Sequence, residues 1–221
     1  MTDMVASEVT RGSHETSWRL TVAFMAFLMA AWGWIYVNVP ALKDLALLYL
    51  LFTFAAITLG GLAYVSNSAY PFAVLGFPLL PDIPMPTLAG AFAGLLWLFA
   101  GGAIFKLTGL QISLYTTLPP LIAYLFAFLI STSEESFFRA TILPMVVRLS
   151  QSKLAGVIIT SIAFSMVHWL AYEATPNYLL SAFLFSILVS YLTLHYRTAW
   201  PAMVAHTVHN VVIVYSLMGL P

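Results

Sequence analysis

Residues 119–149 read PPLIAYLFAFLISTSEESFFRATILPMVVRL. Apart from the stretch STSEESFFR in its middle, this segment is apolar, and it exceeds the roughly 20 residues that a helix needs to span a bilayer. A charge at the centre of a membrane helix costs about 2.5–3.5 kcal/mol on insertion scales, which makes Glu134, Glu135 and Arg139 expensive to keep. We therefore predict a membrane-spanning helix here that carries a functional polar cluster.

The composition of the whole chain supports a membrane protein. Of its 221 residues, 62% are hydrophobic and only 7% are charged, against about 25% charged residues in a typical soluble domain. The predicted fold class is therefore all-α, a polytopic membrane helix bundle. The net charge of zero gives no sign of a nucleic-acid partner. The chain has no cysteine, which excludes disulfides, thiolate metal sites and a cysteine nucleophile.

Outward from residues 119–149, six further segments are apolar enough to span a bilayer, which gives about seven transmembrane helices. They are residues 20–39, 45–65, 87–105, 153–172, 178–196 and 201–220. Residues 66–86 are predicted to form a loop, although apolar residues within 69–80 leave an eighth span open. Residues 106–117 are short and mixed, as in an interfacial helix.

This pattern divides the chain into a soluble N-terminal tail (residues 1–19), an N-terminal transmembrane part with its Pro-rich loop (20–118) and a C-terminal transmembrane core (119–221). The tail lacks the apolar core and cleavage site of a signal peptide.

The distribution of Lys and Arg predicts the orientation in the cell membrane. Basic residues gather on the cytoplasmic side of membrane proteins, and the bias is greatest if the N-terminus is cytoplasmic. In that orientation the cytoplasmic side carries Arg11, Arg19, Arg148, Lys153 and Arg197, and the opposite side carries Lys43 and Lys106.

Helix geometry predicts different partners for the two adjacent carboxylates, Glu134 and Glu135. Glu135 and Arg139 are four residues apart and share a helix face, so we expect an ion pair between them. Glu134 is rotated by about 100° from Glu135, which leaves it for another partner in the bundle. The alternative is that all three side chains form one structural polar network between helices.

Two later helices carry further polar residues. In residues 164–169, FSMVHW, Phe164 and His168 share a face. In residues 206–210, HTVHN, His206 and Asn210 share a face, with His209 one step round. Taken alone, each motif is equally consistent with polar contacts between helices.

Together these groups suggest hydrolysis of a peptide bond. A carboxylate in a low-dielectric site, here Glu134, takes a proton from water with the help of the His168 imidazole. The resulting hydroxide attacks a peptide carbonyl, and His206 with Asn210 donates hydrogen bonds to the developing oxyanion.

The order Glu-Glu-x-x-x-Arg, Phe-x-x-x-His, His-x-x-x-Asn on successive late helices resembles the CPBP family of CAAX proteases and bacteriocin-processing enzymes. This family is also described as abortive-infection proteins or type II CAAX prenyl endopeptidases. The resemblance covers about residues 119–217 and includes the lead-in WPAMVAH at residues 200–206.

The resemblance implies an intramembrane endopeptidase with a conical cavity and no cofactor. It implies that Glu134 is the base, that His168 positions the water, and that His206 and Asn210 form the oxyanion hole. Supporting roles are implied for Glu135, Arg139, Phe164 and His209. The implied substrate is a peptide or membrane protein in the bilayer, either a prenylated C-terminus or a leader or bacteriocin peptide.

The motifs lie at different distances from the ends of their helices. Glu134 and His168 are each about 15 residues from the turn near Ser150, whereas His206 is only about 9 residues from Arg197. If all three meet, the helices on either side of Ser150 are expected to project beyond the bilayer.

Other functions stay open from the sequence. A zinc metalloprotease would use Glu134, His168, His206 and His209, although the chain lacks His-Glu-x-x-His. A non-catalytic membrane scaffold or a bacteriocin self-immunity protein is a second alternative. A proton-coupled transporter also uses carboxylates in the membrane, but paired broken helices in symmetric halves are missing from the sequence. The sequence does not fix the oligomeric state.

Overall fold

The computed structural model describes residues 18–66, 83–105, 118–172 and 176–218, and every regular element in these ranges is a helix. The all-α membrane bundle expected from the sequence is confirmed, and all seven predicted segments coincide with helical rods within a few residues. The elements are α2 (Trp18–Asn38), η1 (Pro40–Leu42), α3 (Lys43–Ser66), α5 (Pro84–Phe105), α7 (Pro120–Phe137), η3 (Phe138–Ile142), α8 (Leu143–Ser150), α9 (Lys153–Tyr172), α10 (Pro176–Tyr196) and α11 (Trp200–Met218).

Within the described ranges, 4 helical stretches are long and apolar enough to cross a membrane: Pro40–Leu62, Pro84–Gly101, Pro120–Ser150 and Pro176–Tyr196. Ala23–Asn38 and Lys153–Trp169 are shorter apolar helices. The number of membrane crossings stays a prediction. The possible eighth span at 69–80 and the interfacial helix at 106–117 lie outside the described residues.

The expected loop at residues 66–86 is wrong at its C-terminal end, because α5 begins at Pro84. Proline is tolerated in the first turn of a helix, where backbone N–H groups have no intrahelical partner. The Thr87 hydroxyl donates to the carbonyl of Ile83 at 2.8 Å and reinforces this first turn.

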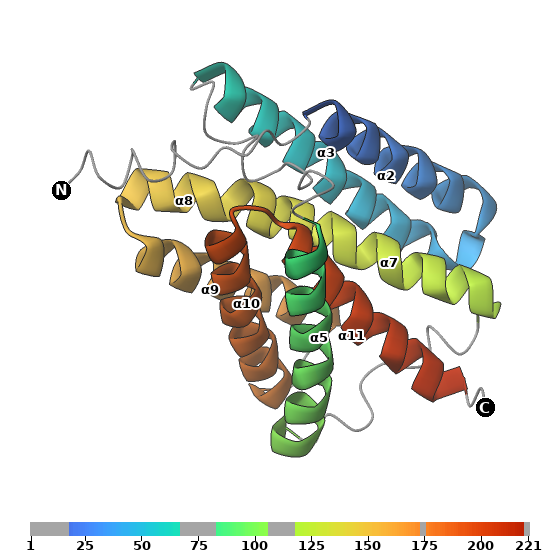
Figure 1. Ribbon diagram of the computed structural model, residues 1–221. Coiled ribbons are helices and arrows are strands. Elements are labelled where there is room, and N and C mark those ends of the chain that lie inside the picture. Colours follow the sequence, from blue (N-terminus) through green and yellow to red (C-terminus); the bar gives the residue numbers. More distant parts are fainter. Residues whose placement is uncertain (1–17, 67–82, 106–117, 173–175, 219–221) are drawn as a thin grey trace.

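The long rod formed by α7, η3 and α8 crosses the middle of the molecule (Figure 1). The antiparallel pair α2 and α3 packs on one side of it, and α5, α9, α10 and α11 lie on the other side (Figure 1). α11 packs against both α7 and α5, and α9 packs against α8 and α10. The rod therefore touches both halves of the bundle.

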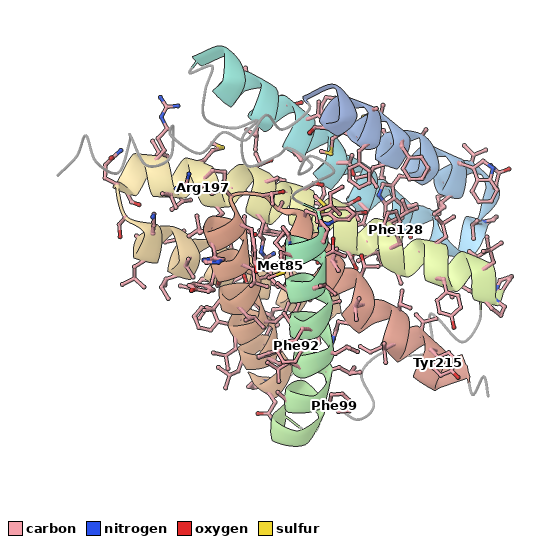
Figure 2. The ribbon with its side chains drawn as sticks, in the orientation of Figure 1. Met85, Phe92, Phe99, Phe128, Arg197 and Tyr215 are labelled. Carbon is pink, nitrogen blue, oxygen red and sulfur yellow. The ribbon has the colours of Figure 1, made fainter. Side chains whose placement is uncertain are left out.

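The outer face of α5 is suited to lipid. Met85, Phe92 and Phe99 recur every seven residues and are 66%, 68% and 73% exposed. Figure 2 shows the three side chains along the length of this helix. A continuous apolar strip of this kind is unusual on a soluble protein, and it agrees with a helix that faces hydrocarbon.

A π-helical turn interrupts the rod directly after the acidic pair. Pro144 has no N–H, so the carbonyl of Ala140 loses its usual helical donor. The Leu143 N–H bonds five residues back to Phe138, and the Thr141 hydroxyl donates to the carbonyl of Ser136 at 3.0 Å. Wide turns of this type occur frequently at functional sites.

The rod extends well past the start of α11. Ala140 packs against Ala199 and Met203, so α11 begins about ten residues short of the end of α8. Gly156 near the start of α9 packs against Val147 of α8. Val147 lies further along the rod than Ala140, where α11 begins. The helices on either side of Ser150 therefore extend past the start of α11. Their expected projection beyond the bilayer stays a prediction.

Two glycines allow α5 to approach α11 closely. A Cβ on Gly90 would lie 2.4 Å from the carbonyl oxygen of Pro201, and a Cβ on Gly94 would lie 2.4 Å from that of Ala205. This Gly-x-x-x-Gly spacing brings two helix backbones together, as in membrane helix pairs generally. Because Ala205 precedes His206, the same contact sets the position of the third motif.

Substitution of Gly94 by Ala is therefore expected to weaken the bundle, although Ala is the better helix former. The added methyl overpacks the α5–α11 contact and should cost about 1–3 kcal/mol of unfolding free energy. Thermal unfolding in detergent micelles would measure this. Gly61→Ala is the matched control, because a Cβ on Gly61 meets no atom within 4 Å. Equal melting temperatures for the two variants would contradict the packing argument.

Candidate active site

The three motifs meet in one buried cluster between α7, α9 and α11. Glu134 Oε2 lies 3.9 Å from His168 Nε2, and Glu135 Oε1 lies 2.8 Å from His206 Nδ1. The exposed fractions of these four residues lie between 0% and 7%. Residues more than 70 positions apart in the sequence therefore share one polar site inside an apolar bundle.

Glu135 has an ion-pair partner on its own helix and a second contact from α11. Arg139 Nε lies 3.1 Å from Glu135 Oε2, and Arg139 Nη1 donates to Oε1 at 3.3 Å. The ion pair predicted from the i, i+4 spacing is confirmed. His206 Nδ1 adds a contact to Oε1 from α11. Glu135 thus links α7 to α11. Glu135, Arg139 and His206 together form the structural part of the cluster.

Glu134 has a different environment. The Tyr49 hydroxyl on α3 donates to Glu134 Oε1 at 2.9 Å. Glu134 Oε2 is buried and has no hydrogen-bond partner among the described residues, and it faces His168 Nε2. Buried polar atoms are almost always hydrogen-bonded. Glu135 Oε2 also has no hydrogen bond, but it lies 3.1 Å from Arg139 Nε, whereas Glu134 Oε2 lies 3.9 Å from His168 Nε2. The structural-network alternative therefore explains Glu135 better than Glu134.

Phe164 links the second motif to the first. His168 Nδ1 lies 2.8 Å from the carbonyl oxygen of Phe164. A carbonyl only accepts hydrogen bonds, so Nδ1 carries the proton and Nε2 of the neutral ring is an acceptor. The Phe164 ring lies 4.4 Å from the His168 ring, and the Arg139 guanidinium lies 4.3 Å from the Phe164 centroid. The backbone carbonyl of Phe164 therefore sets the tautomer of His168, and the Phe164 ring packs against the imidazole.

The third motif bonds to α7 at two successive turns. His206 contacts Glu135, and Asn210 Nδ2 donates to the Ser131 hydroxyl at 3.0 Å. In this structure the two side chains have separate partners rather than one shared oxygen. Each side chain keeps a second polar group for a substrate: Nε2 on the opposite edge of the His206 ring, and the second amide N–H of Asn210.

His209 lies beside the cluster rather than within it. Its ring stacks on Phe185 at 5.8 Å, and its buried Nδ1 has no hydrogen-bond partner among the described residues. In the part of the chain that the structure describes, no three His, Asp or Glu side chains form a group that could hold a metal ion. The zinc hypothesis therefore lacks a ligand set in these residues.

Residues 116–212 match the family model of the type II CAAX prenyl endopeptidase Rce1-like proteins. This part of the chain is therefore similar to the Rce1-like family. All three motifs fall inside the matched region, so the resemblance seen in the sequence is confirmed. No curated protein and no solved structure matches the chain.

Several residues that touch the site lie outside the Rce1-like region and were missed by the sequence analysis. Tyr49 bonds to Glu134, Trp32 Nε1 donates to the Ser133 hydroxyl at 2.6 Å, and the Ser133 and Thr53 hydroxyls are hydrogen-bonded at 3.1 Å. One signal was available, because Tyr49 and Thr53 are polar and share a face of an otherwise apolar helix. The spacing alone does not say which helix this face would meet.

Removal of Arg139 from the Rce1-like core should strongly destabilise the protein. Arg139→Leu leaves Glu135 with a buried negative charge, and breaking a buried pair in this way costs about 3–5 kcal/mol. We expect a large fall in melting temperature in micelles, whereas Arg148→Leu at the exposed end of α8 serves as a neutral control. The double variant Glu135→Leu/Arg139→Leu should recover part of the loss. Equal stability of the two single Arg variants would contradict a buried ion pair.

Proposed function

We propose that the protein is an intramembrane endopeptidase of the glutamate type, which hydrolyses a peptide bond with a water molecule activated by Glu134 and His168. The Rce1-like family is a family of membrane proteases, and the glutamate mechanism is our inference. The observation that carries it is the buried Glu134 Oε2, 3.9 Å from His168 Nε2.

The geometry of these two atoms suits a bridging water. Ionised Glu134 Oε2 and the neutral His168 Nε2 are both acceptors, so they cannot bond to each other. A separation of 3.9 Å is too long for a direct hydrogen bond, and such a contact commonly holds a water molecule. One water has two O–H groups and can donate to both atoms. Its lone pairs then point away from them, towards a substrate carbonyl.

The reaction follows from these contacts. Glu134 takes one proton from the water, and the hydroxide attacks the peptide carbonyl carbon to form a tetrahedral oxyanion. Asn210 and a doubly protonated His206 donate to that oxygen. The Glu135 carboxylate holds the ring through Nδ1, so that Nε2 faces away from Glu135. When the intermediate collapses, Glu134 returns its proton to the leaving amine, which releases one amine and one new carboxylic acid. The acid then loses its proton to solvent.

The cluster also bears on the non-catalytic alternatives. A scaffold or self-immunity protein needs a stable polar core, which Glu135, Arg139 and His206 already supply. The Glu134 carboxylate does not stabilise such a core, because a buried oxygen without a hydrogen bond destabilises the fold. Groups held at a cost to stability are typical of active sites. The hydrolase proposal gives this oxygen a use.

The substrate we propose is a peptide segment within or next to the bilayer, either a prenylated C-terminus or a leader or bacteriocin peptide. The basic residues favour a cytoplasmic N-terminus for this multi-pass chain.

Replacement of Glu134 by Gln should abolish cleavage and leave the fold intact. The amide keeps the size and the contact to Tyr49 but cannot accept a proton from water. Quantitative proteomics of membrane fractions from wild-type and Glu134→Gln strains should show uncleaved peptides accumulating in the variant, which also names the substrates. Asp44→Asn, an exposed carboxylate on α3, is the matched control. A Glu134→Gln strain with the wild-type peptide pattern would rule out Glu134 as the base.

Chelation distinguishes the glutamate mechanism from a zinc-dependent one. The proposed steps use only side chains and water, so exhaustive treatment with EDTA or 1,10-phenanthroline should leave the cleavage rate unchanged. The assay follows a peptide identified by the proteomics, in lipid nanodiscs. Loss of cleavage that added Zn²⁺ restores would favour the metalloprotease alternative.

A further inference from the structure

We propose that Tyr49 is a positioning residue for Glu134, and that the α2–α3 pair forms an aromatic clamp that aims the base at its water. This inference rests on the proposed function and extends it beyond the Rce1-like region, which begins at residue 116. The clamp consists of Trp32, Tyr49 and Thr53. Its targets are Ser133 and Glu134 at the end of α7.

The contact between Tyr49 and Glu134 is buried on both sides. The phenol donates to Oε1 at 2.9 Å, and the two residues are 2% and 3% exposed. A hydrogen bond to an ionised acceptor is about twice as strong as a neutral one. A Glu side chain has three rotatable bonds, and a fixed donor on one oxygen determines where the second oxygen points. Here the second oxygen points at His168 Nε2.

Tyr49 is itself held rigidly. Its ring stacks on Trp32 at 5.2 Å with an interplanar angle of 18°. Trp32 in turn meets the edge of Phe126 on α7 at 5.7 Å. Aromatic pairs of this kind add about 0.5–1.5 kcal/mol beyond the area that they bury. Because the ring cannot tilt away, the hydroxyl stays at one place relative to α7.

The residue next to the base is fixed by the same two helices. Trp32 Nε1 donates to the Ser133 hydroxyl at 2.6 Å, and the Ser133 hydroxyl bonds to that of Thr53 at 3.1 Å. Thr53 also bonds back to the carbonyl of Tyr49 at 2.9 Å, which links the two contacts on α3. Three hydrogen bonds from α2 and α3 therefore converge on two consecutive residues of α7. The N-terminal helices thus act on the orientation of Glu134.

This arrangement predicts an effect on the chemical step rather than on substrate binding. Supporting contacts of catalytic groups typically contribute about 10- to 100-fold to activity, because small misplacements of a reacting group are costly. If Tyr49 only fills space, its hydroxyl is dispensable, and Phe would serve equally well.

The test compares Tyr49→Phe with wild type, Glu134→Gln and Tyr36→Phe. Each full-length protein is placed in lipid nanodiscs and assayed with a quenched fluorescent version of a peptide whose cleavage the Glu134→Gln strain loses. Tyr49→Phe keeps the stacked ring, so its melting temperature should stay close to that of the wild type. We expect kcat to fall about 10- to 100-fold with KM unchanged. Tyr36→Phe removes a phenol hydroxyl from α2 outside the site and should behave as wild type.

The outcomes separate this inference from the proposed function. Wild-type kcat in Tyr49→Phe, together with an inactive Glu134→Gln, overturns the positioning role and leaves the protease proposal standing. A raised KM at constant kcat also overturns it, because Tyr49 would then bind substrate. An active Glu134→Gln variant removes the proposed function and this inference together.

A second measurement is independent of activity. An experimental structure of Tyr49→Phe should show the Glu134 carboxylate rotated, so that neither oxygen remains within about 4 Å of His168 Nε2, while α7 keeps its place. A Glu134 carboxylate in the wild-type orientation would contradict the clamp, and this test requires no substrate.

Discussion

The ion pair between Glu135 and Arg139 is the interaction on which the site depends. An isolated charge in this setting would be strongly disfavoured. The two side chains lie one helical turn apart on the same rod, are fully buried, and are joined by His206 from α11. Glu134 is rotated by about 100° from Glu135 on the same helix, so it faces another direction and takes other partners. One helix therefore holds two adjacent carboxylates in different environments.

The two halves of the chain contribute different things to this site. The Rce1-like region supplies the groups with acid–base chemistry, on α7, α9 and α11. The helices before it supply neutral donors and aromatic rings that contact Ser133 and Glu134. Close approach of α5 through Gly90 and Gly94 sets α11 at the distance at which His206 reaches Glu135. The N-terminal half is therefore part of the site and does more than anchor it in the membrane.

The helical rods and the Glu135–Arg139 pair follow from local rules, namely the length of apolar runs and the i, i+4 spacing. The contact of Tyr49 with Glu134 spans 85 residues, and an apolar helix shows by spacing alone only which residues share a face. The π-turn was also missed, since Pro144 predicts a kink but not its form. The partners of His206 and Asn210 on α7 depend on how α11 is placed by α5, which no local pattern encodes.

If Glu134 and His168 hold a water molecule between them, an experimental structure in lipid nanodiscs at a resolution that shows ordered water will reveal it. We expect density within about 3 Å of both Glu134 Oε2 and His168 Nε2. We also expect Tyr49 to remain bonded to Oε1. A direct bond between the Glu134 and His168 side chains, or a metal ion at that position, would contradict the proposed mechanism.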